Sequence, residues 1–193
     1  MALLTGSSKI KTAVFISGTG SNLKSLIKFS NLKRSPISID LIISDKPKAK
    51  GLEYAKIFKI KKKIFDFKNK NISEKKIILE LKKNKINLIC FAGFMRIISK
   101  NFIKNFKGKI LNIHPSLLPK YKGLNTHQRA IENNDAFSGC SVHYVTSKLD
   151  SGKIILQKKV QITKNDTSKS LAKKILIQEH KLYSKALLKI FSL

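Results

Sequence analysis

The sequence predicts an α/β protein with an open, mostly parallel, twisted sheet, helices on both of its faces, antiparallel strands toward the C-terminal part and a long C-terminal helix. Short apolar runs alternate with segments of helical period through the first part of the chain, which is typical of a parallel sheet covered on both sides. After Pro119 two strands joined by a polar loop precede the last helix. The 193 residues, 42 % hydrophobic and 26 % charged, fit a single domain, 1–193, in which residues 1–10 form an N-terminal extension.

Each element rests on its own local pattern. Strands are expected where short runs are rich in apolar and β-branched residues. In order, they are 12–17, 38–44, 63–67, 88–92, 110–114, 139–146 and 154–162. Helices are expected where apolar residues recur every three or four positions. In order, they are 22–29, 51–57, 73–84, 99–106, 127–133 and 168–191.

The net charge of +29 invites a nucleic-acid interpretation. Only Arg34, Arg96 and Arg129 are arginines among the 40 basic residues, whereas phosphate and base recognition favours the forked guanidinium. The lysines are spread through every predicted helix and loop beside abundant Ile and Asn, as AT-rich codons would produce. Nucleic acid is therefore disfavoured as a partner, although a positive field would speed the capture of small anionic substrates.

The sequence shows neither a membrane span nor a secretory signal, and its two cysteines lack metal-ligand spacing. No apolar run approaches the roughly 18 residues of a membrane span, and residues 1–11 place their apolar part before their basic part, the wrong order for a secretory signal. We therefore expect a cytoplasmic protein without membrane partners. Cys90 and Cys140 lie in apolar strands without metal-ligand spacing, so buried thiols are expected, with a disulfide or a catalytic thiol as alternatives.

Two polar side chains end the strand predicted at 110–114. Asn112 and His114 are two residues apart and so share one face of the strand. Pro115 and Pro119 predict a rigid loop directly after them. The pair can converge on one reacting group, or His114 can be a buried histidine bonded within a tight turn.

A glycine-rich turn, residues 17–22, joins the first strand to the first helix. Its backbone N–H groups and the positive helix end suit a phosphate. The turn lacks the third glycine of the dinucleotide fingerprint and the lysine of the Walker motif. A phosphate monoester is therefore favoured over a structural turn, and a nicotinamide oxidoreductase with Asp40 or Asp45 as its acid is the weaker alternative.

Three further features each have a functional and a structural interpretation. Residues 93–98, just beyond the fourth strand, can form a slot for a flat aromatic ligand or pack under the next helix. Asp150, in the polar loop 146–152, is either a solvated turn residue or a partner of His114 that favours its imidazolium form. Glu179 completes the apolar stripe of the last helix, so it needs a protein cation or a ligand amine as partner.

Together these segments resemble the phosphoribosylglycinamide formyltransferase family, folate-dependent enzymes of purine synthesis. The resemblance rests on ISGTGSNLKSLI, AGFMRII, LNIHPSLLPKYKGLNTHQRAIEN, GCSVHYVTSKLDSGKIILQKKV and QEH, which occur in this order. It implies a Rossmann-like formyltransferase fold and transfer of a formyl group from 10-formyltetrahydrofolate to the amine of glycinamide ribonucleotide. It further implies two small-molecule substrates, no metal, and a monomer or weak homodimer.

The resemblance also implies residue roles. The catalytic residues would be Asn112 and His114, which stabilise an oxyanion, and Asp150, which supports a protonated His114. The substrate residues would be Gly20, Ser21 and Asn22 at the phosphate and Glu179 at the amine. The donor slot would comprise Lys70, Met95, Arg96, Ile97, Ile98 and Asn112.

Three positions depart from the family pattern. Lys70 stands where some relatives have arginine, Lys122 where proline is frequent and Ser151 where glycine is usual; the last two bear on loop stiffness more than on chemistry. Formyltetrahydrofolate hydrolase and methionyl-tRNA formyltransferase share the Asn, His and Asp arrangement. The hydrolase carries an extra N-terminal regulatory domain and a different loop after its histidine, while the tRNA enzyme has a C-terminal barrel and lacks the GSN turn.

Overall fold

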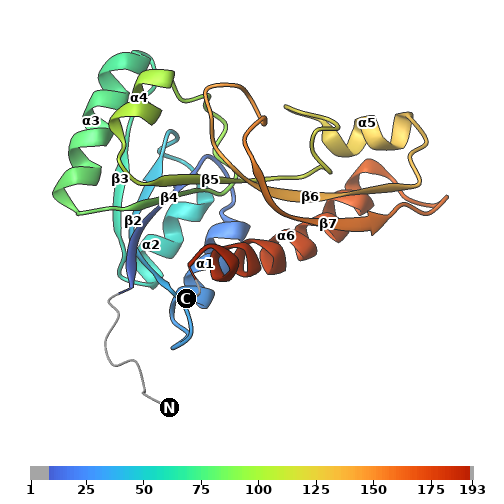
Figure 1. Cartoon of the computed structure of the whole chain (residues 1–193), viewed down its shortest axis with the longest axis horizontal. Coiled ribbons are helices and arrows are strands. Elements are labelled where there is room, and N and C mark those ends of the chain that lie inside the picture. Colours follow the sequence, from blue (N-terminus) through green and yellow to red (C-terminus); the bar gives the residue numbers. More distant parts are fainter. Residues whose placement is uncertain (1–8, 192–193) are drawn as a thin grey trace.

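The computed structural model describes residues 9–191 and contains one seven-stranded sheet in the order β3-β2-β1-β4-β5-β6-β7 (Figure 1). The strands are β1 Ile10–Ile16, β2 Ile37–Ser44, β3 Lys61–Ile64, β4 Leu88–Phe91, β5 Lys109–His114, β6 Phe137–Tyr144 and β7 Ile154–Gln161. Pairing is parallel from β3 to β5 and antiparallel from β5 to β7. The predicted fold class is confirmed.

The helices follow the predicted order, with shifted ends. They are α1 Ser21–Ser30, η1 Lys50–Leu52, α2 Glu53–Ile57, α3 Lys70–Lys83, α4 Lys100–Asn105, α5 Thr126–Glu132 and α6 Ser168–Phe191. Helix α3 begins three residues before its predicted start because the Asn69 side chain accepts a hydrogen bond from the Ile72 N–H at 3.2 Å, which caps the helix there. Ile10 already belongs to β1, and residues 1–8 of the predicted extension lie outside the described residues.

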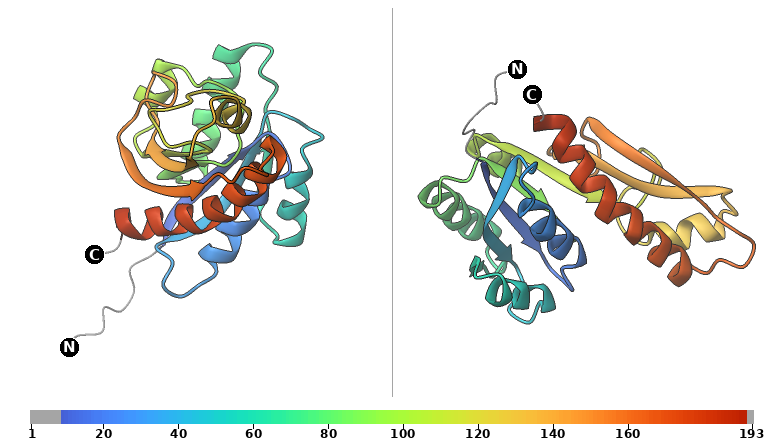
Figure 2. Two further views of the ribbon diagram at one scale, coloured as in Figure 1. Left: turned by 90° about the vertical axis from the view of Figure 1, so that its right-hand side faces the viewer. Right: turned by 90° about the horizontal axis from the view of Figure 1, so that it is seen from below.

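Helices cover both faces of the sheet because successive strand residues point to opposite sides. Val14 and Ile16 pack with α1, α2 and α6 in one buried cluster. Ala13 and Phe15 pack on the other side with residues of α3 and α4. Helix α6 packs on the same face of the sheet as α1, against β6 and β7, and also contacts α1 itself. The C-terminal part of the chain therefore lies against the first helix (Figure 1, Figure 2).

Strand β3 is the outermost strand beside β2, and all four of its residues are exposed. Three of them are lysines, 61–63. The Lys61 Nζ lies 2.8 Å from a Glu80 carboxylate oxygen of α3, while the remaining backbone edge of β3 has no strand beside it in the described sheet.

Both cysteines are buried free thiols, which confirms the prediction for them. Burial raises the pKa of Cys90 and of Cys140 to about 12. Within residues 9–191, no helix has the length and hydropathy that a membrane crossing needs.

Candidate active site

The candidate active site lies at the carboxyl ends of β1, β4 and β5, the edge at which open α/β sheets bind ligands. Asn112 and His114 end β5, and the antiparallel strand β6 sets His143 opposite Asn112. The Asn112 Nδ2 lies 3.2 Å from His143 Nε2, and His143 Nδ1 lies 2.9 Å from the Tyr144 carbonyl oxygen. Since the carbonyl can only accept, Nδ1–H of His143 donates to it and Nε2 accepts from the Asn112 amide.

His114 is buried, with 5 % of its surface exposed, and both ring nitrogens face protein acceptors. Its Nε2 lies 2.8 Å from the carbonyl oxygen of Tyr121, and its Nδ1 lies 3.4 Å from Asp150 Oδ2. Tyr121 has a left-handed φ of 55°, which belongs to the turn that aims this carbonyl at the ring. Burial lowers the pKa of His114, and the Tyr121 carbonyl and Asp150 only partly offset that effect. Asp150 therefore favours the imidazolium, as expected, but the pKa as a whole is lowered.

Asp150 reaches this cluster because its loop folds over the end of β5. Its side chain is 7 % exposed, its Oδ2 accepts the Gly123 N–H at 2.9 Å, and its Oδ1 lies 3.6 Å from His143 Nε2. Burial raises the pKa of Asp150, but the interaction with the nearby His143 ring, the hydrogen bond from the Gly123 N–H and the charge of His114 outweigh it, so the pKa is lowered. The alternative of a solvated turn aspartate does not describe this side chain.

The two loop positions that depart from the family pattern contact one another. Lys122 Nζ donates to Ser151 Oγ at 2.6 Å, which ties the loop after β5 to the residue following Asp150. The Lys122 carbonyl also accepts a hydrogen bond of 2.8 Å from Arg129 Nη1. A cross-loop hydrogen bond thus joins the two positions at which the resemblance implies proline and glycine.

The glycine turn begins α1 without a side-chain cap, which leaves the first N–H groups of the helix available. Gly20 has a φ of 74°, and a Cβ atom there would lie 2.7 Å from the Cα of Gly51. Only glycine fits this close approach, and Gly51 N–H in turn donates to the Gly18 carbonyl at 3.0 Å. Ser21 is the first residue of α1. The turn is therefore a fixed backbone cradle at the positive end of a helix, as the phosphate interpretation requires.

Asn22 and Glu179 meet although they are 157 residues apart in sequence. Asn22 Nδ2 donates to Glu179 Oε2 at 2.7 Å, and both side chains are buried at 7 % exposure. Burial raises the pKa of Glu179, because the hydrogen bond from Asn22 offsets desolvation only in part. Asn22 Oδ1 is buried without a partner among the described residues, and no lysine or arginine of residues 9–191 forms an ion pair with Glu179. Of the two alternatives for Glu179, an internal salt bridge is absent from the described residues, and the carboxylate keeps capacity for a ligand donor.

The segment 93–98 presents two apolar side chains to solvent. Met95 is 60 % and Ile97 is 59 % exposed, whereas Ile98 is 5 % exposed and belongs to the core under α4. The Ile98 side chain therefore cannot line the predicted slot, although its backbone can. Lys70 is the first residue of α3, and no hydrogen bond or ion pair within residues 9–191 joins it to this segment.

Sequence reasoning missed His143, Ser17 and the part played by Asp45 at this edge. A histidine in an apolar strand carries no signal of its own, and only the pairing of β5 with β6 brings His143 to Asn112. The oxidoreductase alternative would use Asp45 as its acid. Asp45 instead accepts hydrogen bonds from Ser17 Oγ at 2.6 Å and from Arg96 Nε at 2.7 Å. Within residues 9–191, no group of three or more His, Cys, Asp or Glu side chains is arranged to hold a metal ion.

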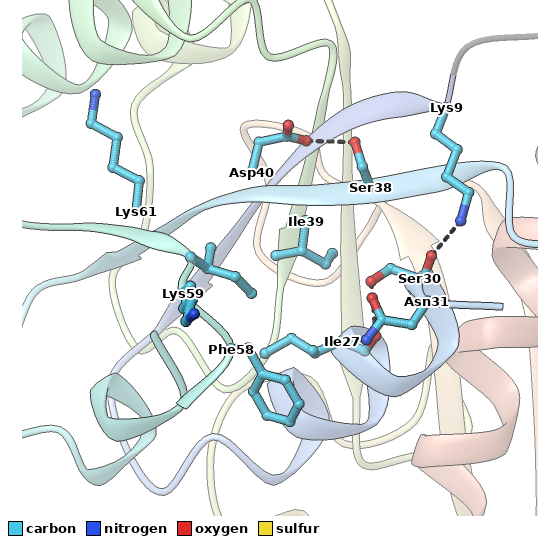
Figure 3. Close-up of a pocket in the computed structure, with 11 residues that line it drawn as sticks. Lys9, Ile27, Ser30, Asn31, Ser38, Ile39, Asp40, Phe58, Lys59 and Lys61 are labelled. Atoms are coloured by element: carbon cyan, nitrogen blue, oxygen red, sulfur yellow. Dashed lines mark hydrogen bonds between the residues drawn. The ribbon is translucent and has the colours of Figure 1, made fainter. Parts of the chain in front are cut away.

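A cleft of about 760 Å³ lies at the opposite, amino-terminal edge of β2 (Figure 3). Two hydrogen bonds join polar groups of its lining: Ser38 Oγ donates to Asp40 Oδ2 at 2.6 Å, and Lys9 Nζ donates to the Ser30 carbonyl at 2.6 Å. No histidine lines it. The cleft thus lacks the histidine pair and the free helix N-terminus found at the carboxyl ends of the strands.

Comparison with known proteins shows which family the chain resembles over nearly its whole length. The family model described as "Formyl transferase" matches residues 10–187. Phosphoribosylglycinamide formyltransferase of Escherichia coli (strain K12) is 39 % identical over 173 residues, which cover 88 % of this chain and 82 % of that protein. The human trifunctional purine biosynthetic protein adenosine-3 is 41 % identical over 93 % of this chain, which spans only 18 % of that protein's length. The crystal structure of phosphoribosylglycinamide formyltransferase from Brucella melitensis superposes with a TM-score of 0.89 at 41 % identity, covering 95 % of this chain and 96 % of that one.

Proposed function

The chain belongs to the phosphoribosylglycinamide formyltransferase family, and on that premise we propose that it transfers the formyl group of 10-formyltetrahydrofolate to the amine of glycinamide ribonucleotide. The observation that carries the proposal is the convergence of Asn112, His114 and Asp150 at the end of β5. Gly20 to Asn22 would hold the phosphate, and Glu179 the amine. The predicted monomer or weak homodimer stays a prediction.

Asn112 and His114 would stabilise the charge that develops when the amine attacks the formyl carbon. In this step a C–N bond to the substrate forms, negative charge appears on the formyl oxygen, and the bond to the folate nitrogen then breaks as that nitrogen takes up the amine's proton. His143 uses one N–H of the Asn112 amide, which leaves the other N–H for the oxyanion.

The two contacts of His114 suggest which ring nitrogen acts. The Nε2–H is committed to the Tyr121 carbonyl at 2.8 Å, whereas Nδ1 is held loosely, 3.4 Å from Asp150. Nδ1–H would therefore donate to the oxyanion, while the Asp150 carboxylate stabilises the imidazolium. Because burial lowers the pKa of His114, the imidazolium form that this donation needs becomes more populated as the pH falls.

A formyl-transfer assay with both substrates tests the proposal. The wild-type protein should form formylglycinamide ribonucleotide, and Asn112→Ala and His114→Ala should each lower kcat by about 100-fold or more, since one oxyanion donor contributes about 3 to 4 kcal/mol. Ser38→Ala, in the cleft at the other edge, should retain wild-type activity. Consumption of 10-formyltetrahydrofolate without transfer to the ribonucleotide would instead indicate a hydrolase and overturn the proposal.

A further inference from the structure

We propose that Ser17 and Asp45 are positioning residues that hold segment 93–97 as the wall of the formyl donor's site, and so set affinity for the donor without setting affinity for the ribonucleotide. This inference rests on the proposed function. Asp45 lies outside the segments that carry the family resemblance, and Ser17, the first residue of the glycine-rich turn, is not among the residues assigned to the donor or to the phosphate.

Ser17 and Asp45 directly follow the neighbouring strands β1 and β2, at the same carboxyl edge as the site. Their side chains are buried and bonded to each other, with Ser17 Oγ donating to Asp45 Oδ1 at 2.6 Å. A buried carboxylate is costly unless donors surround it, and this one has Ser17 on one oxygen and Arg96 Nε, at 2.7 Å, on the other.

Ser17 carries the connection from the strands to the segment. Its N–H donates to the Gly93 carbonyl at 3.0 Å, and its Oγ accepts the Met95 N–H at 2.9 Å. With the Asp45 bond to Arg96, three neighbouring residues of the segment are tied to the ends of β1 and β2. Gly93 has a φ of 74°, the left-handed turn that brings the chain back over these strands.

This tethering explains an arrangement that core packing does not. Met95 and Ile97 are more than half exposed, although large apolar side chains gain free energy from burial. The Met95 N–H is held by the buried Ser17 hydroxyl and the neighbouring Arg96 side chain by the buried Asp45 carboxylate, which fixes the course of the segment with these side chains outward. A segment held open in this way binds a flat ligand without first losing conformational freedom, and that preorganisation strengthens binding.

The far end of the segment is held in the same manner. Glu74 of α3 is buried at 5 % exposure and accepts the Ser99 N–H at 2.8 Å and the Ser99 hydroxyl. The slot wall therefore lies between two buried carboxylates from different elements. Asp45 bonds to Ser17 and to Arg96 within the segment, and Glu74 bonds to Ser99, the residue that caps α4 just after the segment.

The test compares the full-length wild type with Asp45→Ala, Asp45→Asn and Asp40→Ala. Asp40 is the matched control, because it lies on the same strand and accepts from the Ser38 hydroxyl at 2.6 Å and the Thr12 N–H at 3.3 Å, but at the opposite edge. Titration calorimetry measures the dissociation constants for tetrahydrofolate and, separately, for glycinamide ribonucleotide, and steady-state assays measure kcat at saturating substrates.

Asp45→Ala should weaken tetrahydrofolate binding about tenfold, while the ribonucleotide constant and kcat change less than about twofold. Asp45→Asn keeps one acceptor oxygen and should recover part of the loss, and Asp40→Ala should bind both ligands as wild type does. Unchanged tetrahydrofolate affinity in Asp45→Ala, or an equal loss for both ligands, overturns the inference.

If Asp45→Ala fails to fold, Ser17→Ala takes its place, because it removes the acceptor of the Met95 N–H but leaves the Asp45 to Arg96 ion pair. Unchanged tetrahydrofolate affinity in Ser17→Ala likewise overturns the inference. Wild-type protein that binds no tetrahydrofolate would overturn the proposed function as well, so the two failures are distinguishable.

Discussion

Replacing Glu179 with glutamine should weaken binding of the amine substrate and stabilise the fold. The carboxylate is 7 % exposed, and its sole bonded partner in the described structure is the Asn22 amide, at 2.7 Å. A hydrogen bond to a charged group contributes about 1.5 to 3 kcal/mol, and since 1.4 kcal/mol is a factor of ten, Glu179→Gln should raise KM for glycinamide ribonucleotide about 10- to 150-fold.

The stability effect has the opposite sign. The pKa of Glu179 is raised in the fold above its ordinary value of 4.5, so the folded state disfavours the ionised form and its stability falls as the pH rises above 4.5. At pH 7.5 Glu179→Gln removes that cost and should raise Tm, and the gain should vanish near pH 4.

Glu80 provides the matched control for both measurements. Its carboxylate pairs with Lys61 at 2.8 Å, and its pKa is lowered, chiefly by that hydrogen bond. Glu80→Gln should therefore leave KM unchanged and should not raise Tm. A Glu179→Gln variant with wild-type KM and a lower Tm would refute the reasoning, since it would make the carboxylate a structural group only.

Three further expectations follow from the charges and thiols. Asp150→Asn should lower the pKa of His114 further, because Asp150 raises it, so the loss of turnover with rising pH should move to lower pH; NMR titration of His114 and a pH–rate profile would check this, and an unmoved profile would contradict it. Asp166 has a lowered pKa and stabilises the start of α6, so Asp166→Ala should lower Tm at pH 7, and the difference from wild type should shrink as the pH falls below 3.8 in thermal denaturation scans. Cys90 and Cys140, with pKa values of about 12, should resist a thiol reagent at pH 7.5 until the protein is unfolded with guanidinium; rapid labelling of native protein would show that the burial is wrong.

The sequence pattern predicts a helix or strand well where the element's own residues carry a continuous periodicity. The apolar stripe of the last helix gives its bounds, 168–191, because the stripe is continuous. The third strand is predicted too late, at 63–67, because Phe65 and Phe67 suggest a buried strand, whereas they pack against the core from the loop that follows β3. An exposed edge strand made mostly of lysine has no apolar alternation to reveal it.

In the candidate site, too, residues close together in sequence are predictable and contacts between distant segments are not. Asn112 and His114 are predictable because two residues of one strand must share a face. His143 requires the register of β5 on β6, and the Glu179 to Asn22 contact requires α6 to cross back to α1. Neither relation is encoded by neighbouring residues, so only the assembled sheet reveals them.

The lysines of β3 have a consequence beyond the general excess of charge. An unpaired sheet edge is a template onto which another strand can add, and neighbouring strands lie about 4.8 Å apart. If a second copy docked edge to edge on residues 61–64, the lysines of the two strands would face each other at that spacing. The like charges would repel, and the lysine side chains would lose part of their hydration. The same lysines that carry no evident recognition role would thereby oppose fibre-like growth of the sheet and help keep folded copies apart at high concentration.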